Sequence, residues 1–219
     1  MIIAIVALLV LLTSLTVKQP AVDECNNMLF YSVNQGDATA YYTIDIASNQ
    51  FEPFPLTNIA STPSWSPNGF TMAVAVQNAD GSSNIYLVSD QGLTTLVGTV
   101  HATAPVIRWS PDNSLLAFET GRAITIIDLH NQKETSIFSE DGDYHLGEWS
   151  PDGEHIAITM RHENWSTLLS FNVEQDTTTA LTNAVDGKYD YFVSWAPNST
   201  EIYFNTNRFS DSLVLYKIN

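Results

Sequence analysis

The stretch HLGEWSPDGEHIAI, His145–Ile158, places a tryptophan, a tight polar turn and an apolar segment in direct succession. Ser150–Gly153 has turn chemistry at every position, because proline fixes φ, aspartate bonds to its own backbone, and glycine accepts a left-handed conformation. The apolar residues Ile156–Ile158 are typical of a buried strand. Strand, glycine-closed turn and strand together predict a β-hairpin.

The same order of residues occurs four times. Further copies begin at Trp65, Trp109 and Trp195, so that successive tryptophans are 44, 40 and 46 residues apart. A third β-rich run follows each of the four hairpins, and in the first three repeats a fourth run comes after it. Four short strands in a repeat of this length are typical of a propeller blade. We therefore predict an all-β fold, a β-propeller of four-stranded blades whose repeat runs from Met28 to Asn219.

The number of blades stays open at this stage. About 18 strands are expected, whereas closed rings of four and five blades need about 16 and 20. Either a propeller of four to five blades lacks strands where the ring joins, or the sequence is a piece of a larger propeller. An open ring exposes unpaired strand edges, so it needs a partner or a second protomer to cover them.

One tryptophan per repeat is expected to pack between blades. Each blade is covered on both faces by its neighbours, so a large side chain at one fixed position can fill the gap between two sheets. This role is predicted for Trp65, Trp109, Trp149 and Trp195.

The repeated pattern WSPDG…IAF…IY…D…LT resembles the TolB-like repeat, most closely in WSPDGEHIAI and WSPNGFTMAV. That repeat belongs to periplasmic TolB and to the propeller domains of dipeptidyl-peptidase and prolyl-oligopeptidase relatives. The resemblance implies the propeller fold, but propellers of this type occur in binding proteins and in enzymes alike. Asn113 and Ser199 replace the glycine, and Ala196 replaces the serine. Because serine tolerates the left-handed conformation poorly, we expect the last turn to differ in shape.

The N-terminus has a different character from the repeats. Residues Ile2–Val17 are apolar apart from hydroxyl side chains, which predicts a signal peptide or an N-terminal membrane anchor within residues 1–24. The propeller domain is then residues 25–219, and an extracytoplasmic location follows, either periplasmic or at the cell surface. Cys25 is the only cysteine, so no intrachain disulfide forms, and Val22–Glu24 does not resemble a lipobox.

The charge of the protein restricts its partners. There are 24 acidic residues against 8 basic ones, for a net charge of −16. Such a surface repels nucleic acid and anionic lipid, so the membrane is expected to matter only through the N-terminal segment. It favours a protein partner that carries a basic patch.

No catalytic, cofactor or metal-binding motif stands out. The sequence has no G-x-S-x-G elbow, no phosphate-binding glycine loop and no metal-binding histidine spacing. Asp141 and Asp143 are the best Ca²⁺ ligands on offer, but the remaining oxygen ligands of a loop site are missing. We therefore predict no catalytic residues, no cofactor and no metal.

Candidate binding residues are aromatic side chains on the predicted loops of one propeller face, where recognition is more common than core packing. Packing at the rim of a neighbouring blade is the alternative role for them. Two charged residues that directly precede a blade tryptophan are expected near the channel, where they can pair. The candidates are Tyr144, Trp165, Tyr189, Tyr191, Arg108 and Glu148.

The sequence favours a non-catalytic module that binds a protein or acts as a scaffold. One alternative is the propeller portion of a peptidase-like or other hydrolase system, which predicts a hydrolase domain elsewhere or carboxylates converging in the channel. A purely structural spacer is the other alternative, and it predicts no concave aromatic patch.

Overall fold

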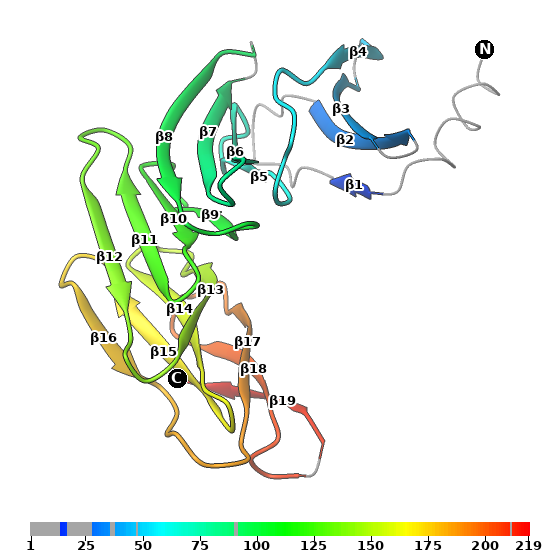
Figure 1. Cartoon of the computed structure of the whole chain (residues 1–219). Helices are drawn as coiled ribbons and strands as arrows, with labels where there is room; N and C mark the ends of the chain where they lie inside the picture. Colours follow the sequence, from blue (N-terminus) through cyan, green and yellow to red (C-terminus); the bar gives the residue numbers. More distant parts are fainter. Residues whose placement is uncertain (1–13, 17–27, 36–37, 47, 90–91, 211) are drawn as a thin grey trace. The chain divides into compact units, whose positions relative to one another are not determined.

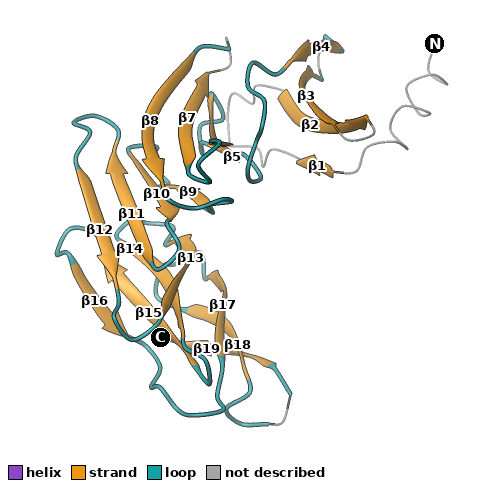
Figure 2. Ribbon diagram, viewed as in Figure 1, coloured by secondary structure: helices purple, strands orange, loops and turns teal. Residues whose placement is uncertain are grey.

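The computed structural model describes residues 14–16, 28–35, 38–46, 48–89, 92–210 and 212–219. Every regular element in these ranges is a β-strand (Figure 2). The all-β prediction is confirmed. Cys25 and most of the apolar N-terminal segment lie outside the described residues. None of the described segments forms a helix long and apolar enough to cross a membrane.

Nineteen strands form five antiparallel sheets in the described part of the chain (Figure 1). In each sheet the strands follow sequence order, so every sheet is a simple meander, as expected for a blade. The strand that the sequence did not predict is β1 (Ser14–Thr16), which lies in the apolar N-terminal segment and pairs with β2. The first four sheets therefore have four strands each, and the last has three among the described residues.

The chain divides into two compact units, and unit 1 is Met1–Thr99. Its first sheet holds β1, β2 (Met28–Gln35), β3 (Ala38–Asp45) and β4 (Gln50–Pro53). Its second sheet holds β5 (Ser64–Trp65), β6 (Thr71–Gln77), β7 (Ser83–Ser89) and β8 (Thr94–Val100), which runs one residue past the unit boundary.

The core of unit 1 joins its two sheets. Phe30 of β2 meets Phe54 edge to face at a centroid distance of 4.9 Å and stacks on Tyr41 of β3 at 5.7 Å. These rings belong to one buried cluster with Met72 of β6, and Trp65 packs against it. The first repeat tryptophan therefore packs between blades, as the repeat predicts.

Unit 2 is Val100–Asn219 and contains three sheets. The third sheet holds β9 (Ile107–Trp109), β10 (Leu115–Glu119), β11 (Ala123–Asp128) and β12 (Glu134–Phe138). The fourth holds β13 (Asp143–Trp149), β14 (His155–Arg161), β15 (Ser166–Asn172) and β16 (Thr177–Ala180). The fifth holds β17 (Asp190–Trp195), β18 (Ile202–Thr206) and β19 (Val214–Ile218).

Tryptophans connect neighbouring blades of unit 2 by both packing and hydrogen bonding. Trp149 is 7% exposed and lies in the cluster between the third and fourth sheets. Its Nε1 donates to the carbonyl of Arg108 at 3.3 Å, and Trp195 Nε1 donates to the carbonyl of Glu148 at 3.0 Å. Each acceptor is the residue directly before the tryptophan of the preceding blade. The indole thus fills the gap and satisfies its own donor there.

The four predicted turns lie between the first and second strands of their blades. In the fourth blade, Ser150 Oγ donates to Asp152 Oδ1 at 2.5 Å and accepts from the His155 amide at 2.9 Å. Gly153 has a φ of 78°, the left-handed conformation that the motif requires.

The expectation that the last turn differs in shape was wrong. Ser199 has a φ of 60°, and its amide donates to the Ala196 carbonyl at 3.0 Å, just as Gly153 donates to Ser150 at 2.9 Å. The Ser199 hydroxyl accepts a hydrogen bond from the Asp152 amide at 3.0 Å, which links the turns of two blades. That contact offsets the strain of a left-handed serine.

Candidate functional site

The first strands of the three blades in unit 2, together with β14, line a hollow of about 420 Å³. Three of the predicted binding residues meet there, namely Arg108 from β9, Glu148 from β13 and Tyr191 from β17. We call it the inner-strand hollow, and its other lining residues are His145, Leu146, Gly147, Thr159, Arg161, Phe192 and Val193.

One wall of this hollow depends on close packing around Gly147 of β13, against the backbone of β14 and the Phe192 side chain of β17. A Cβ atom on Gly147 would lie 2.7 Å from the Ala157 carbonyl oxygen and 3.0 Å from Phe192 Cδ1, so glycine is required. The Phe192 amide donates to Thr159 Oγ1 at 3.3 Å. Both strands change pairing register at this level, which is typical of bulges that redirect side chains beside a site.

Charged groups line the hollow without forming the predicted pair. Arg108 Nη1 donates to the Ile107 carbonyl at 3.1 Å, and among the described residues Arg108 and Glu148 form no ion pair. The expected pairing was therefore wrong, since the guanidinium turns to a backbone acceptor while Glu148 is exposed to water.

A neighbouring carboxylate is already occupied within the protein. Glu119, at the end of β10, accepts from the Leu146 amide at 2.9 Å and lies 3.2 Å from His145 Nδ1. Its two oxygens thus attach the third blade to the first strand of the fourth. This carboxylate was not predicted as part of a site, and only the pairing of the blades brings it there.

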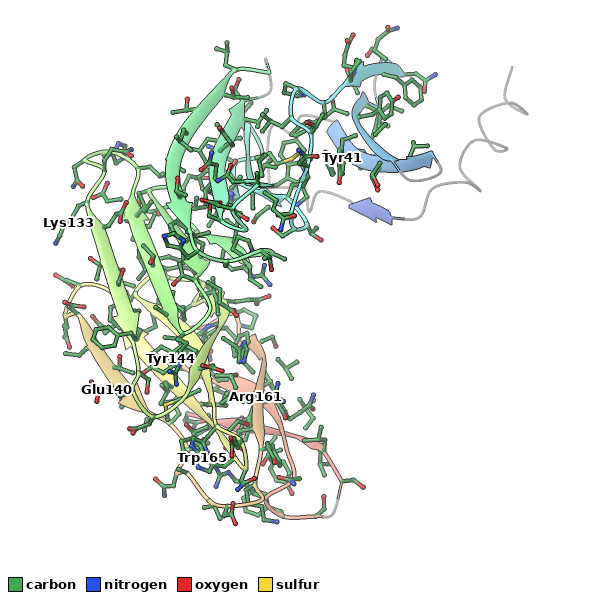
Figure 3. All side chains as sticks on the ribbon, in the orientation of Figure 1. Tyr41, Lys133, Glu140, Tyr144, Arg161 and Trp165 are labelled. Carbon is green, nitrogen blue, oxygen red and sulfur yellow. The ribbon has the colours of Figure 1, made fainter. Side chains whose placement is uncertain are left out.

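Tyr144 is not a loop residue, contrary to the prediction. It lies inside β13 opposite Met160 and is only 7% exposed (Figure 3). It belongs to the core cluster that also contains Leu146 and Trp149. Strand β13 begins at Asp143, earlier than expected, because that residue pairs with Arg161 at the end of β14. The alternation of Tyr144 with Leu146 was the signal that could have revealed this burial.

Tyr189 and Tyr191 lie side by side, as their spacing along a strand allows. Their rings are stacked at a centroid distance of 6.3 Å with an interplanar angle of 3°. Tyr191 is not a loop residue as predicted, because it lies in β17, where it pairs with Asn205 of β18 and lines the hollow. Tyr189 directly precedes the strand. Both side chains are partly exposed.

Trp165 is on a loop, as predicted, in the hairpin that joins β14 to β15 (Figure 3). Its indole stacks on the His162 ring at 5.1 Å and 10°. The hairpin is fixed to the segment 181–189, because Gly187 N donates to the Asn164 carbonyl at 2.7 Å and Ser166 N donates to the Lys188 carbonyl at 3.0 Å. We call residues 162–165 and 181–189 together the loop face.

A buried ion pair lies directly beneath the loop face. Asp190 is fully buried, and Arg208 Nε donates to its two carboxylate oxygens at 2.9 and 2.8 Å. Arg208 also donates to the Asn183 carbonyl, and Ser166 Oγ donates to the Asp190 carbonyl at 2.8 Å. This network was not predicted from the sequence, because its members converge only in the tertiary structure.

The acidic segment that was weighed as a Ca²⁺ loop is engaged elsewhere. Asp143 Oδ1 lies 3.0 Å from Arg122 Nε, so its charge is already compensated. Across the described ranges, no group of three or more His, Cys, Asp or Glu side chains is arranged to hold a metal ion.

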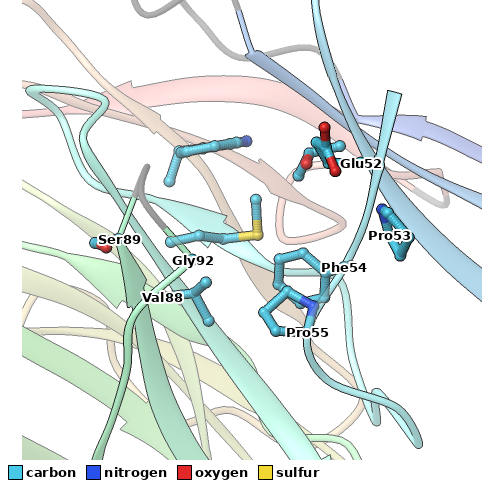
Figure 4. A pocket seen from close by; sticks show the side chains of 10 residues that line it. Glu52, Pro53, Phe54, Pro55, Val88, Ser89 and Gly92 are labelled. Carbon is cyan, nitrogen blue, oxygen red and sulfur yellow. The ribbon is translucent and has the colours of Figure 1, made fainter. Parts of the chain in front are cut away.

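Unit 1 has a hollow of its own, of about 350 Å³, between its two sheets (Figure 4). Its lining is mostly apolar and includes Phe54, Met72 and Val88, with Glu52 among its few polar members. None of the predicted binding residues lies in it.

Comparison with known proteins decides the family. The family model of the TolB beta propeller domain matches residues 28–219. The chain belongs to this family. The TolB-like resemblance of the repeat is thereby confirmed. No curated protein matches the sequence.

Solved structures share the fold of this TolB-type propeller at low sequence identity. TolB from Acinetobacter baumannii matches with a TM-score of 0.61 and 18% identity over 88% of this chain and 49% of that one. A protein described as TolB from Agrobacterium tumefaciens matches with a TM-score of 0.58 and 17% identity over 87% and 73%. An acylaminoacyl peptidase from Pyrococcus horikoshii matches with a TM-score of 0.60 and 11% identity over 83% and 34%. The chain thus spans about half the length of the first of these proteins.

Proposed function

We propose that this TolB-type propeller is an extracytoplasmic, non-catalytic module that binds a protein partner on its loop face. The observation that carries the proposal is the fixed arrangement of Trp165, Tyr189 and Tyr191. These partly exposed aromatic side chains sit on segments that are hydrogen-bonded to each other and to the buried pair Asp190–Arg208.

Rigid aromatic side chains are suited to recognition. Tyrosine and tryptophan provide a large contact area, and little conformational entropy is lost when their positions are already set. The stacked pair Tyr189–Tyr191 extends this aromatic surface from the loop face into the inner-strand hollow.

The charge of the loop face suggests the kind of partner. Glu163 and Asp186 are exposed on it and outnumber its one lysine, the half-buried Lys188. Glu140 and Asp141 are exposed on the loop that leads into β13. With a net charge of −16 on the protein, we expect a basic patch on the partner and faster association at low salt. Exposed charges are screened over about 8 Å at physiological ionic strength, so binding should weaken as salt is added.

The experiment is a pull-down from the native envelope fraction at low and high salt. The wild-type protein is compared with the double variant Tyr189→Ala/Tyr191→Ala, and Phe70→Ala serves as the control. Phe70 is an aromatic residue, 37% exposed, in the turn between β5 and β6 of unit 1, and it belongs to neither the loop face nor the inner-strand hollow. The double variant should lose the partner and the control should keep it. Retention of every partner by the double variant contradicts the proposal.

The peptidase-like alternative has a separate test. The likeness to acylaminoacyl peptidase is at 11% identity, so it supports the fold alone. Hydrolysis of peptide or glycoside substrates by the purified protein, lost on substitution of Glu148 or Glu119, would favour that alternative over the binding module.

A further inference from the structure

Two of the four arginines of this strongly acidic protein have no acidic partner in the part of the chain that the structure describes. All four lie in the described ranges, where Arg122 pairs with Asp143 and Arg208 pairs with Asp190. Neither Arg108 nor Arg161 has a carboxylate oxygen within 4.0 Å among the described residues. Both of them line the inner-strand hollow.

The local charge of the hollow is opposite in sign to that of the whole protein. Arg108 and Arg161 provide two positive charges, and Glu148 is the one carboxylate among the lining residues. Glu119 lies behind the hollow, where the Leu146 amide and His145 already use its oxygens. Arg108, Arg161 and Glu148 therefore leave one positive charge in excess at the lining itself. A carboxylate matches that charge better than a phosphomonoester, which carries about −1.5 to −2.

The remaining walls suit an organic group that carries such a charge. Phe192, Leu146 and Val193 form an apolar side of the hollow, and the Tyr191 phenol offers a hydroxyl donor. A volume of about 420 Å³ accommodates one or two amino-acid side chains and falls within the range of small-ligand sites. Guanidinium groups recognise carboxylates well, because their paired donors match the two oxygens.

We propose that the inner-strand hollow binds a carboxylate group of a peptide through Arg108 and Arg161. The carboxylate belongs to an aspartate or glutamate side chain or to the C-terminus of the peptide. The inference rests on the proposed function, because it assumes that this peptide is part of the protein that binds the loop face. It adds that a partner with a basic patch inserts one acidic group at the centre of the contact.

The test is an NMR titration of the full-length, ¹⁵N-labelled protein, in which the signals of the Gly147 and Phe192 amides are monitored. The probes are an acetylated, amidated tetrapeptide with a phenylalanine and a single glutamate, its glutamine twin, and the glutamine twin with a free C-terminal carboxylate. Inorganic phosphate is the fourth probe. The glutamate peptide or the free C-terminus should give saturable shifts at both amides, and the stronger of the two identifies the source of the carboxylate.

Arginine variants then assign the contact. Arg161→Gln and Arg108→Gln should each weaken binding of the carboxylate peptide about tenfold or more, because each substitution removes the charge-assisted hydrogen bonds of one guanidinium. Arg122→Gln is the matched control, because its guanidinium is exposed and pairs with Asp143 outside the hollow. It should leave the affinity unchanged.

Any one of four results overturns the inference. The first two are equal binding of the neutral twin and phosphate binding at least as tight as that of the peptides. The other two are an Arg161→Gln variant with unaltered affinity and the absence of saturable shifts with every probe. The two proposals fail separately. If the wild-type protein binds the carboxylate peptide but the Tyr189→Ala/Tyr191→Ala variant retains every partner, only the proposed function is contradicted.

Discussion

Removal of the Asp190 carboxylate should strongly destabilise unit 2. The Asp190 side chain is fully buried and the Arg208 side chain is 14% exposed, so Asp190→Ala leaves a guanidinium charge without its partner in a largely desolvated place. Breaking a buried pair by removing one member costs about 3 to 5 kcal/mol. For a protein of this length, each kcal/mol lowers the Tm by about 2 to 4 °C, so we expect a decrease of about 6 to 20 °C.

The assay is thermal and urea unfolding followed by circular dichroism and tryptophan fluorescence. Asp143→Ala is the matched control, because it also removes an aspartate from an arginine, but the Asp143 and Arg122 side chains are 55% and 70% exposed. Exposed pairs contribute about 0 to 1 kcal/mol. The control should therefore shift the Tm by only a few degrees.

A double variant tests whether the unpaired charge is the cause. Asp190→Leu/Arg208→Met removes both charges, and such replacements are often neutral or stabilising by about 1 to 4 kcal/mol relative to the pair. It should be more stable than Asp190→Ala. Equal Tm shifts in Asp190→Ala and Asp143→Ala, or a double variant less stable than Asp190→Ala, would refute the reasoning.

Two further predictions concern the repeat motif. Trp149→Ala should lower the free energy of unfolding by about 3 to 5 kcal/mol, because it leaves a cavity between two blades. Trp165→Ala, on a loop, should lower it far less. Equal shifts of the urea midpoint in the two variants would contradict the packing role of Trp149. Burial opposes ionisation of Asp152, but hydrogen bonds from Ser150 Oγ and the Glu154 amide outweigh it and hold the carboxyl pKa below its usual 3.8. This stabilisation is present above pH 3.8 and is lost as the pH falls through the lower folded-state pKa. Asp152→Asn should therefore flatten the acid side of a plot of the free energy of unfolding against pH. An unchanged plot would count against the turn network.

The repeat architecture was predictable because its causes are local. A proline, an aspartate or asparagine and a left-handed residue form each turn from neighbouring backbone atoms, and strands follow on either side. The recurrence of Trp65, Trp109, Trp149 and Trp195 then indicated blades and the interfaces between them. The family assignment over residues 28–219 agrees with that interpretation.

Errors arose where a residue's environment comes from another blade or from a distant part of its own hairpin. Ser199 takes up the glycine conformation while its hydroxyl meets the Asp152 amide, 47 positions away in the sequence. Tyr144 became a core residue because β14 extends to Arg161 and pairs with the start of β13. Turn chemistry predicts neither contact, and for Tyr144 only its alternation with Leu146 pointed to burial.

The candidate site shows the same difference between features with local causes and features that depend on distant contacts. Trp165, Tyr189 and Tyr191 were selected from residue type and expected loop position, which is right for Trp165 and Tyr189 and wrong for Tyr191 in β17, and their role in binding stays a prediction. Only the packing of three blades brings Arg108 and Arg161 to one hollow and buries Asp190 against Arg208. The same packing gives neither Arg108 nor Arg161 a carboxylate partner among the described residues. Turns and strands are specified by neighbours along the sequence, whereas the charge of a hollow depends on which distant side chains meet there and which are already paired.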